Sequence, residues 1–122
     1  MTTKIISHDD CLQHLNIQGH PEQVARLQYV LAALEPLGLE SVNAPLITDD
    51  DLLRVHPQRH INAIRAAAPE SGWSSLDADT HMSPGTLNAA LRAAGGAIRA
   101  VDMVMAGEAH NVFVATRPPG HH

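Results

Sequence analysis

The strongest strand signal of the chain is NVFVATRPPGHH, residues 111–122. The short apolar run at residues 112–115 is the pattern of a parallel strand that helices cover on both faces. Directly after it, two prolines fix φ and a glycine frees it, which predicts a rigid turn that delivers the imidazoles of His121 and His122 to one place. Because open α/β sheets bind their ligands at the carboxyl ends of their strands, this turn is the candidate site.

Two further strands and a helix are predicted in the first half of the chain. The β-branched residues at positions 4–7 predict a short strand near the N-terminus. Apolar residues at steps of three and four predict an amphipathic helix that starts near Pro21 and is stopped by Pro36 and Gly38; they are Val24, Leu27, Leu31 and Leu34. Residues 42–47 are apolar but contain a proline, which suits a strand near the edge of a sheet.

Two more helices, separated by a loop, follow in the sequence. Pro57 suits the start of a short helix, and Pro69 suits its end. Residues 69–81 are rich in Ser, Asp and Gly, so we expect a loop there. Ser83, followed by a proline, suits the start of the longest helix, which Gly107 closes.

The order strand, helix, strand, helices, strand favours right-handed βαβ crossovers and therefore an α/β fold. We expect a short parallel sheet of about three strands with flanking helices, built as a single domain over residues 1–122. Within the longest helix, Gly95 and Gly96 each cost about 1 kcal/mol relative to alanine. Such a pair indicates a close approach to another backbone at that point.

Composition argues against two classes of function. The chain has 122 residues, eight Lys and Arg against thirteen Asp and Glu, and a net charge of −5. Since no basic face is present, binding to a nucleic-acid backbone lacks its main electrostatic attraction. No apolar run approaches the ~20 residues that span a bilayer, and no secretory signal follows Met1, so we expect a cytoplasmic protein. The single cysteine, Cys11, is expected to be a small, partly buried residue.

Histidine occurs nine times, and the residues alone leave its role open. Imidazole titrates near neutrality and therefore suits general acid and base catalysis, but a tandem His is equally compatible with a surface tail or the remnant of a tag. His56 and His60, spaced i and i+4, resemble a zinc-binding pair but lack the accompanying glutamate, so ordinary polar residues are the simpler interpretation, as for His20.

The acidic run at residues 49–51 suits the first turn of a helix capped by Thr48.

The landmarks of this sequence, taken together and in order, resemble those of the histone deacetylase family and its bacterial relatives, the acetylpolyamine amidohydrolases and acetoin-utilisation proteins. The resemblance fits the bacterial and class II style of sequence better than class I. It rests on Gly19-His20-Pro21-Glu22 with Arg26, Leu52-Leu53-Arg54-Val55-His56, Leu76-Asp77-Ala78-Asp79-Thr80, Ala93-Ala94-Gly95-Gly96 and the segment at residues 111–122.

The resemblance implies the N-terminal third of an arginase/deacetylase-type catalytic domain that hydrolyses an acetylated amine, either acetyl-lysine or an acetylpolyamine, with zinc. By their positions in the motifs, His122 matches the general base and acid, and His121 matches its electrostatic partner. Asp79 matches a residue that hydrogen-bonds the substrate backbone at the pocket rim. Arg26 matches an arginine that lines an internal channel.

The sequence also departs from the family pattern, because the family's zinc ligands come after the tandem histidines. A zinc-bound water is activated only in an open three-ligand site, so we expect this chain alone to hold no zinc tightly and to be inactive. We also expect it to form a homo-oligomer through an exposed sheet edge or the helix faces beside it. The alternatives are a non-catalytic oligomeric α/β module and a small metal-binding module that uses His121 and His122.

Overall fold

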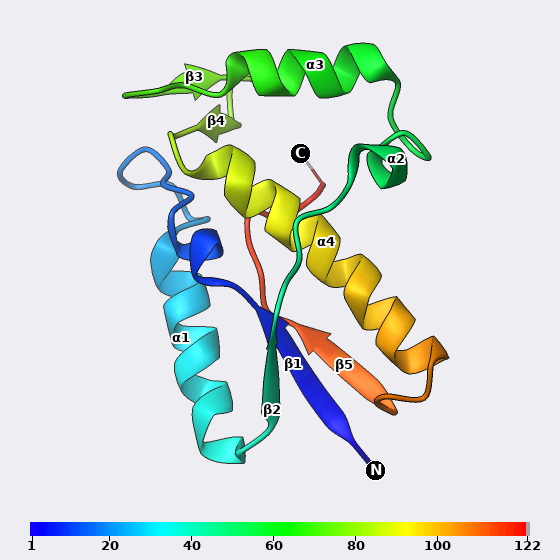
Figure 1. The fold of residues 1–122 in the computed structure, drawn as a ribbon. Helices are drawn as coiled ribbons and strands as arrows, with labels where there is room; N and C mark the ends of the chain where they lie inside the picture. The colour runs from blue at the N-terminus through cyan, green and yellow to red at the C-terminus, as the bar shows by residue number, and fades with distance from the viewer. Residues whose placement is uncertain (122) are drawn as a thin grey trace.

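A three-stranded parallel sheet forms the centre of the computed structural model, which describes residues 1–121 (Figure 1). The middle strand is β1 (Thr3–Ser7); β2 (Glu40–Asn43) pairs with it on one side and β5 (Asn111–Val114) on the other, both parallel to it. Ile6 of β1 lies opposite Val114 of β5 in this register. The α/β fold and the short parallel sheet are therefore as the sequence predicts.

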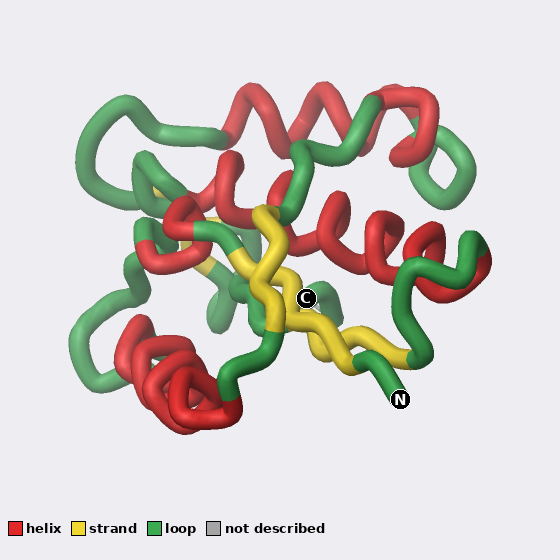
Figure 2. The backbone as a smooth tube through the Cα atoms, turned by 60° about the horizontal axis from the view of Figure 1, so that its bottom comes forward, coloured by secondary structure: helices red, strands yellow, loops and turns green. Residues whose placement is uncertain are grey.

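Helices lie on both faces of this sheet. In Figure 2 the helix α1 (Val24–Leu34) covers one face and the long helix α4 (Thr86–Met105) covers the other, with α3 (Gln58–Ala67) outside α4. The smaller elements are η1 (Asp9–Leu12), η2 (Glu35–Leu37), α2 (Asp49–Leu52) and a two-stranded antiparallel pair, β3 (Ser74–Ser75) with β4 (His81–Met82). No helix within residues 1–121 is long and apolar enough to cross a membrane.

The core has two halves, one on each face of the sheet. Successive side chains of a strand point to opposite faces, so Ile5 and Ile6 of β1 enter different halves. On the α1 side Ile5 packs with Cys11, Leu27 and Ala115, and on the α4 side Ile6 packs with Ala44 and Met103. Cys11, expected to be partly buried, is completely buried.

Four boundaries differ from those expected. α1 begins at Val24 rather than near Pro21. β2 covers residues 40–43 rather than 42–47, because the chain leaves β1 after Ala44 and the amide of Ile47 instead donates to Leu91 of α4. The long helix begins at Thr86, and Ser83 is not its cap but part of a buried polar cluster. The loop at residues 69–81 contains β3 and the start of β4.

The expectation that helices cover residues 112–115 on both faces holds only in part, because on the α1 face Ala115 is buried but Phe113 is not. The side chains of Val112 and Val114 lie toward α4, where Val112 packs against the core and Val114 lies near Gly96. Phe113 points to the other face and is 50% exposed. α1 does not reach far enough across the sheet to cover it, so an apolar run alone overestimates how completely β5 is buried.

The Gly95-Gly96 pair lies where α4 meets the segment after β2. A Cβ atom on Gly95 would lie 2.0 Å from the carbonyl oxygen of Pro45 and 2.8 Å from the amide nitrogen of Ile47. A Cβ atom on Gly96 would lie 3.2 Å from side-chain atoms of Ile6 and Ala44. The close approach of two backbones predicted from the sequence is confirmed, and it explains why glycine occupies a helix interior.

We therefore expect Gly95→Ala to destabilise the fold. The substitution gains about 1 kcal/mol of helix propensity, but overpacking against fixed backbone costs more, so the net loss should be at least about 2 kcal/mol. Urea denaturation followed by circular dichroism measures it. Gly120→Ala is the matched control, because a Cβ atom there meets nothing within 4 Å; equal stability of the two variants would contradict the packing argument.

Candidate active site

Arg117 anchors the turn after β5 and is only 3% exposed. Its Nε and Nη2 atoms donate to the two carboxylate oxygens of Glu22 at 3.0 and 2.9 Å. Its Nη1 donates to the backbone carbonyl of Cys11 at 3.1 Å and also to that of His14. A planar guanidinium thus ties the start of the Pro-Pro-Gly turn to the segment between β1 and α1.

Glu22 receives further hydrogen bonds on its carboxylate. Asn16 Nδ2 donates to Oε2 at 2.7 Å, and the same amide also donates to the backbone carbonyl of Glu22. His14 Nε2 lies 3.6 Å from Oε2. Burial alone would raise the pKa of Glu22, but the hydrogen bonds and charge of Arg117 outweigh it, so the pKa lies below its ordinary value.

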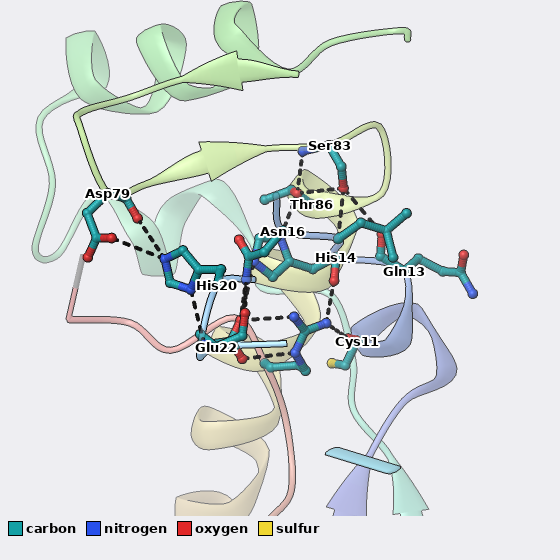
Figure 3. Close-up of polar contacts among 11 residues, drawn as sticks. Cys11, Gln13, His14, Asn16, His20, Glu22, Asp79, Ser83 and Thr86 are labelled. Atoms are coloured by element: carbon teal, nitrogen blue, oxygen red, sulfur yellow. Dashed lines mark hydrogen bonds and ion pairs between the residues drawn. The ribbon is translucent and has the colours of Figure 1, made fainter. Parts of the chain in front are cut away.

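His14 connects this ion pair to the start of α4. Its Nδ1 lies 2.7 Å from Thr86 Oγ1, which in turn lies 3.1 Å from Ser83 Oγ (Figure 3). Ser83 Oγ accepts a hydrogen bond from the amide of Leu15 at 3.0 Å. Burial, together with the charge of Arg117, holds the pKa of His14 below its ordinary value, so the ring is neutral at pH 7.

His20 connects the same loop to Asp79. The amide of Glu22 donates to His20 Nδ1 at 3.0 Å, so in the neutral ring the proton is on Nε2. That Nε2 lies 3.2 Å from Asp79 Oδ1 and 3.3 Å from the carbonyl oxygen of Asp79 (Figure 3). The amide of Asp79 donates to Asp77 Oδ1 at 2.8 Å, which fixes the loop on which Asp79 lies.

Two cavities flank the Glu22–Arg117 pair. The first, about 420 Å³, is lined by residues 118–120 and by the His20–Asp79 pair, and the buried Thr80 Oγ1 in its wall has no hydrogen-bond partner among the described residues. The second, about 340 Å³, is lined by Arg26 together with residues of α1 and the turn. Glu22 and Pro119 line both cavities, so they form the wall between the two.

The site residues predicted from the sequence lie at two different cavities. Asp79 lies at the first cavity with its side chain 70% exposed, and the exposed His121 directly follows the turn that lines it. Arg26 lines the second cavity instead. His122 lies outside the described residues.

Sequence reasoning missed Glu22, Arg117 and His14 as parts of the site. The first two were visible as opposite charges, each next to a proline in a landmark motif, but no spacing rule pairs residues 95 positions apart. His14 carried no signal at all. Only the fold brings Glu22 and His14 to Arg117 at the start of the turn.

The described residues do not by themselves fit a zinc site. Within residues 1–121 no three His, Cys, Asp or Glu side chains are placed to hold a metal ion. His56 and His60 have ring centroids 4.8 Å apart and both line the first cavity, without a third ligand. Asp49 and Asp51 of the acidic run pair with Arg65 and Arg54. Burial raises the pKa of the Cys11 thiol, which keeps it protonated at neutral pH.

Comparison with known proteins gives consistent matches. Residues 20–122 match the histone deacetylase domain. A probable deacetylase of Archaeoglobus fulgidus is 36% identical over 100% of this chain and 35% of its own length. A histone deacetylase-like amidohydrolase of Pseudomonas aeruginosa is 39% identical over 85% of this chain and 28% of its own length. The crystal structure of the HDA15 HD domain superimposes with a TM-score of 0.91 at 29% identity, covering 99% of this chain and 36% of that one.

The fold and the anchored His turn thus define a deacetylase-type α/β module. With a domain match that extends over most of its length, the chain belongs to the histone deacetylase family. It spans about a third of the length of the relatives described above.

The two lowered pKa values predict acid destabilisation. His14 has a folded pKa below its ordinary value of 6.5, so the unfolded chain takes up a proton first as the pH falls, and stability is lost below that pH. Glu22 has a folded pKa below its ordinary value of 4.5, so its contribution is lost at lower pH still. Urea denaturation between pH 7 and 4 should show the free energy of unfolding falling. His14→Gln should flatten the part between pH 6.5 and 5, and an unchanged slope would contradict the assignment.

Proposed function

We propose that this chain is the N-terminal part of a cytoplasmic, zinc-dependent deacetylase that hydrolyses an acetylated amine, either acetyl-lysine or an acetylpolyamine. Membership of the family supports the reaction class. The observation that carries the proposal is the anchoring of the Pro-Pro-Gly turn beside a cavity of about 420 Å³ by the buried Arg117–Glu22 pair. A rigid turn of this kind suits catalytic groups that must be held in place during proton transfer.

The roles of individual residues are part of the same proposal. His122 transfers the proton as general base and acid, and His121 acts beside it as the electrostatic partner. Asp79, at the first cavity with an exposed carboxylate, binds the backbone of the substrate. Arg26 lines an internal channel, in agreement with its place on the second cavity. Since residues 1–121 contain no three-ligand cluster, we propose that the zinc ligands lie outside them.

The activity test compares the isolated 122-residue chain with the full-length gene product. With zinc and an acetyl-lysine or acetylpolyamine reporter, the isolated chain should give no turnover, because residues 1–121 hold no three-ligand cluster that could bind zinc and activate its water. The full-length product should hydrolyse the reporter, and His121→Ala or His122→Ala should each slow it by about 10²-fold or more.

His110→Ala is the control for these two substitutions, because His110 lies before β5 and accepts a hydrogen bond from the amide of Thr2. It should leave the rate unchanged. Zinc-dependent hydrolysis by the isolated chain would contradict the proposal that the zinc ligands lie outside residues 1–121. A zinc-loaded full-length product without hydrolysis would contradict the proposed deacetylase activity.

A second candidate, a non-catalytic oligomeric module, is favoured by the exposed side of β5. Within residues 1–121, β5 pairs only with β1, and Phe113 beside its free edge is half exposed. Unpaired strands next to exposed apolar side chains promote association with another chain. We propose that the isolated chain self-associates with a second copy of itself through this edge.

Sedimentation velocity at micromolar concentration tests self-association. We expect a dimer or larger species for the isolated chain, and Phe113→Asp should shift it toward monomer by placing a charge in the contact. Val101→Asp, at an exposed position of α4, distinguishes contact through the β5 edge from contact through the α4 face. If Val101→Asp produces monomer and Phe113→Asp does not, the α4 face is the contact. A monomeric parent chain would refute the proposal.

A further inference from the structure

We propose that Glu22 is a positioning residue that couples the loop carrying Asp79 to the turn carrying His121. The inference deepens the proposed function and rests on it, because it concerns the two places where that function puts substrate binding and proton transfer.

The first half of the coupling runs through the carboxylate. Both oxygens of Glu22 accept hydrogen bonds from Arg117, and Arg117 immediately precedes the turn at residues 118–120. The guanidinium is almost completely buried and the carboxylate side chain is 14% exposed, so water competes little for either partner. A displacement of the carboxylate would therefore either break these two hydrogen bonds or move the turn with it.

The second half runs through the backbone of the same residue. The Glu22 amide donates to His20 Nδ1, which fixes the proton of the neutral ring on Nε2. Nε2 then reaches both the carbonyl oxygen and the carboxylate of Asp79, 59 positions away in sequence. One residue thus contacts His20 through its main chain and Arg117 through its side chain.

Glu22 also lies between the two cavities. It lines both cavities, so it lies between the candidate substrate pocket and the cavity of Arg26. Asn16 and His14 surround the carboxylate on its remaining side. If Glu22 only stabilised the fold, its hydrogen bonds with Arg117 would be sufficient. The further hydrogen bond from the Glu22 amide to His20, whose ring reaches Asp79, would not be needed.

The test uses Glu22→Gln in the isolated chain and two-dimensional NMR. Glutamine keeps the shape and one acceptor but places an amide N–H group opposite a guanidinium N–H, so one of the two hydrogen bonds to Arg117 is lost. The backbone amide that binds His20 is chemically unchanged. We expect shifts at both ends: the amide signals of Gly120 and His121, and the ring nitrogens of His20 with the amide of Asp79.

Two control variants separate coupling from loss of stability. Glu108→Gln removes a surface pair with Arg99, whose Nη2 lies 2.8 Å from Glu108 Oε2, by the same chemical change. Ile6→Val removes a methyl group from the core half on the α4 side. Neither should shift the signals of His121 and Asp79 together. Arg117→Lys, which cannot make the paired hydrogen bonds, should reproduce the Glu22→Gln pattern.

The NMR shifts test the proposal without any measurement of enzymatic activity. Shifts confined to Asn16 and His14 in Glu22→Gln, or the same shifts in Ile6→Val, would overturn it. In the full-length gene product, Glu22→Gln should lower kcat/KM by at least about tenfold, because small misplacements of catalytic groups have effects of this size. An inactive parent would count against the proposed function alone, whereas an active parent with an unaffected Glu22→Gln variant would count against the positioning role.

Discussion

The buried pair between Arg117 and Glu22 is the interaction on which the site depends. Removing two charges from water is costly, and a pair this buried is tolerated only when further hydrogen bonds compensate both partners. Here the guanidinium also donates to two backbone carbonyls, and the carboxylate also accepts from Asn16. Burial of this pair is therefore weak evidence for net stability, whereas its paired hydrogen bonds fix the position of Arg117 at the start of the turn after β5.

The fold was predictable because its signals are local. Periodicity predicts the existence and the end of α1, although the helix begins at Val24 and not near Pro21, and the Gly95-Gly96 pair correctly indicates backbone contact. The errors arise where tertiary contacts override local pattern. β2 ends early because Ile47 pairs with α4, and β5 is half covered because α1 lies over only part of the sheet. Neither effect leaves a trace in composition or spacing.

The site was predictable only in part, for a related reason. The sequence at residues 117–122 is conspicuous for two prolines, a glycine and two histidines, whereas the roles of Asp79 and Arg26 rest on the resemblance and stay predictions. The residues that hold the turn come from the segment after β1, nearly a hundred positions away. Opposite charges far apart in a sequence have many alternative partners, and only the parallel pairing of β1 with β5 brings these two together.

That parallel pairing also explains why the site has two sides. The carboxyl ends of β1 and β5 meet at one edge of the sheet, so the chain segments after both strands must share the space between α1 and α4. The segment after β1 supplies carbonyls and Glu22, and the segment after β5 supplies the guanidinium that they bind. Glu22 of this contact and Pro119 of the turn line both cavities and form the wall that the two cavities share. Asp79 and Arg26 therefore lie at different cavities, on opposite sides of this wall.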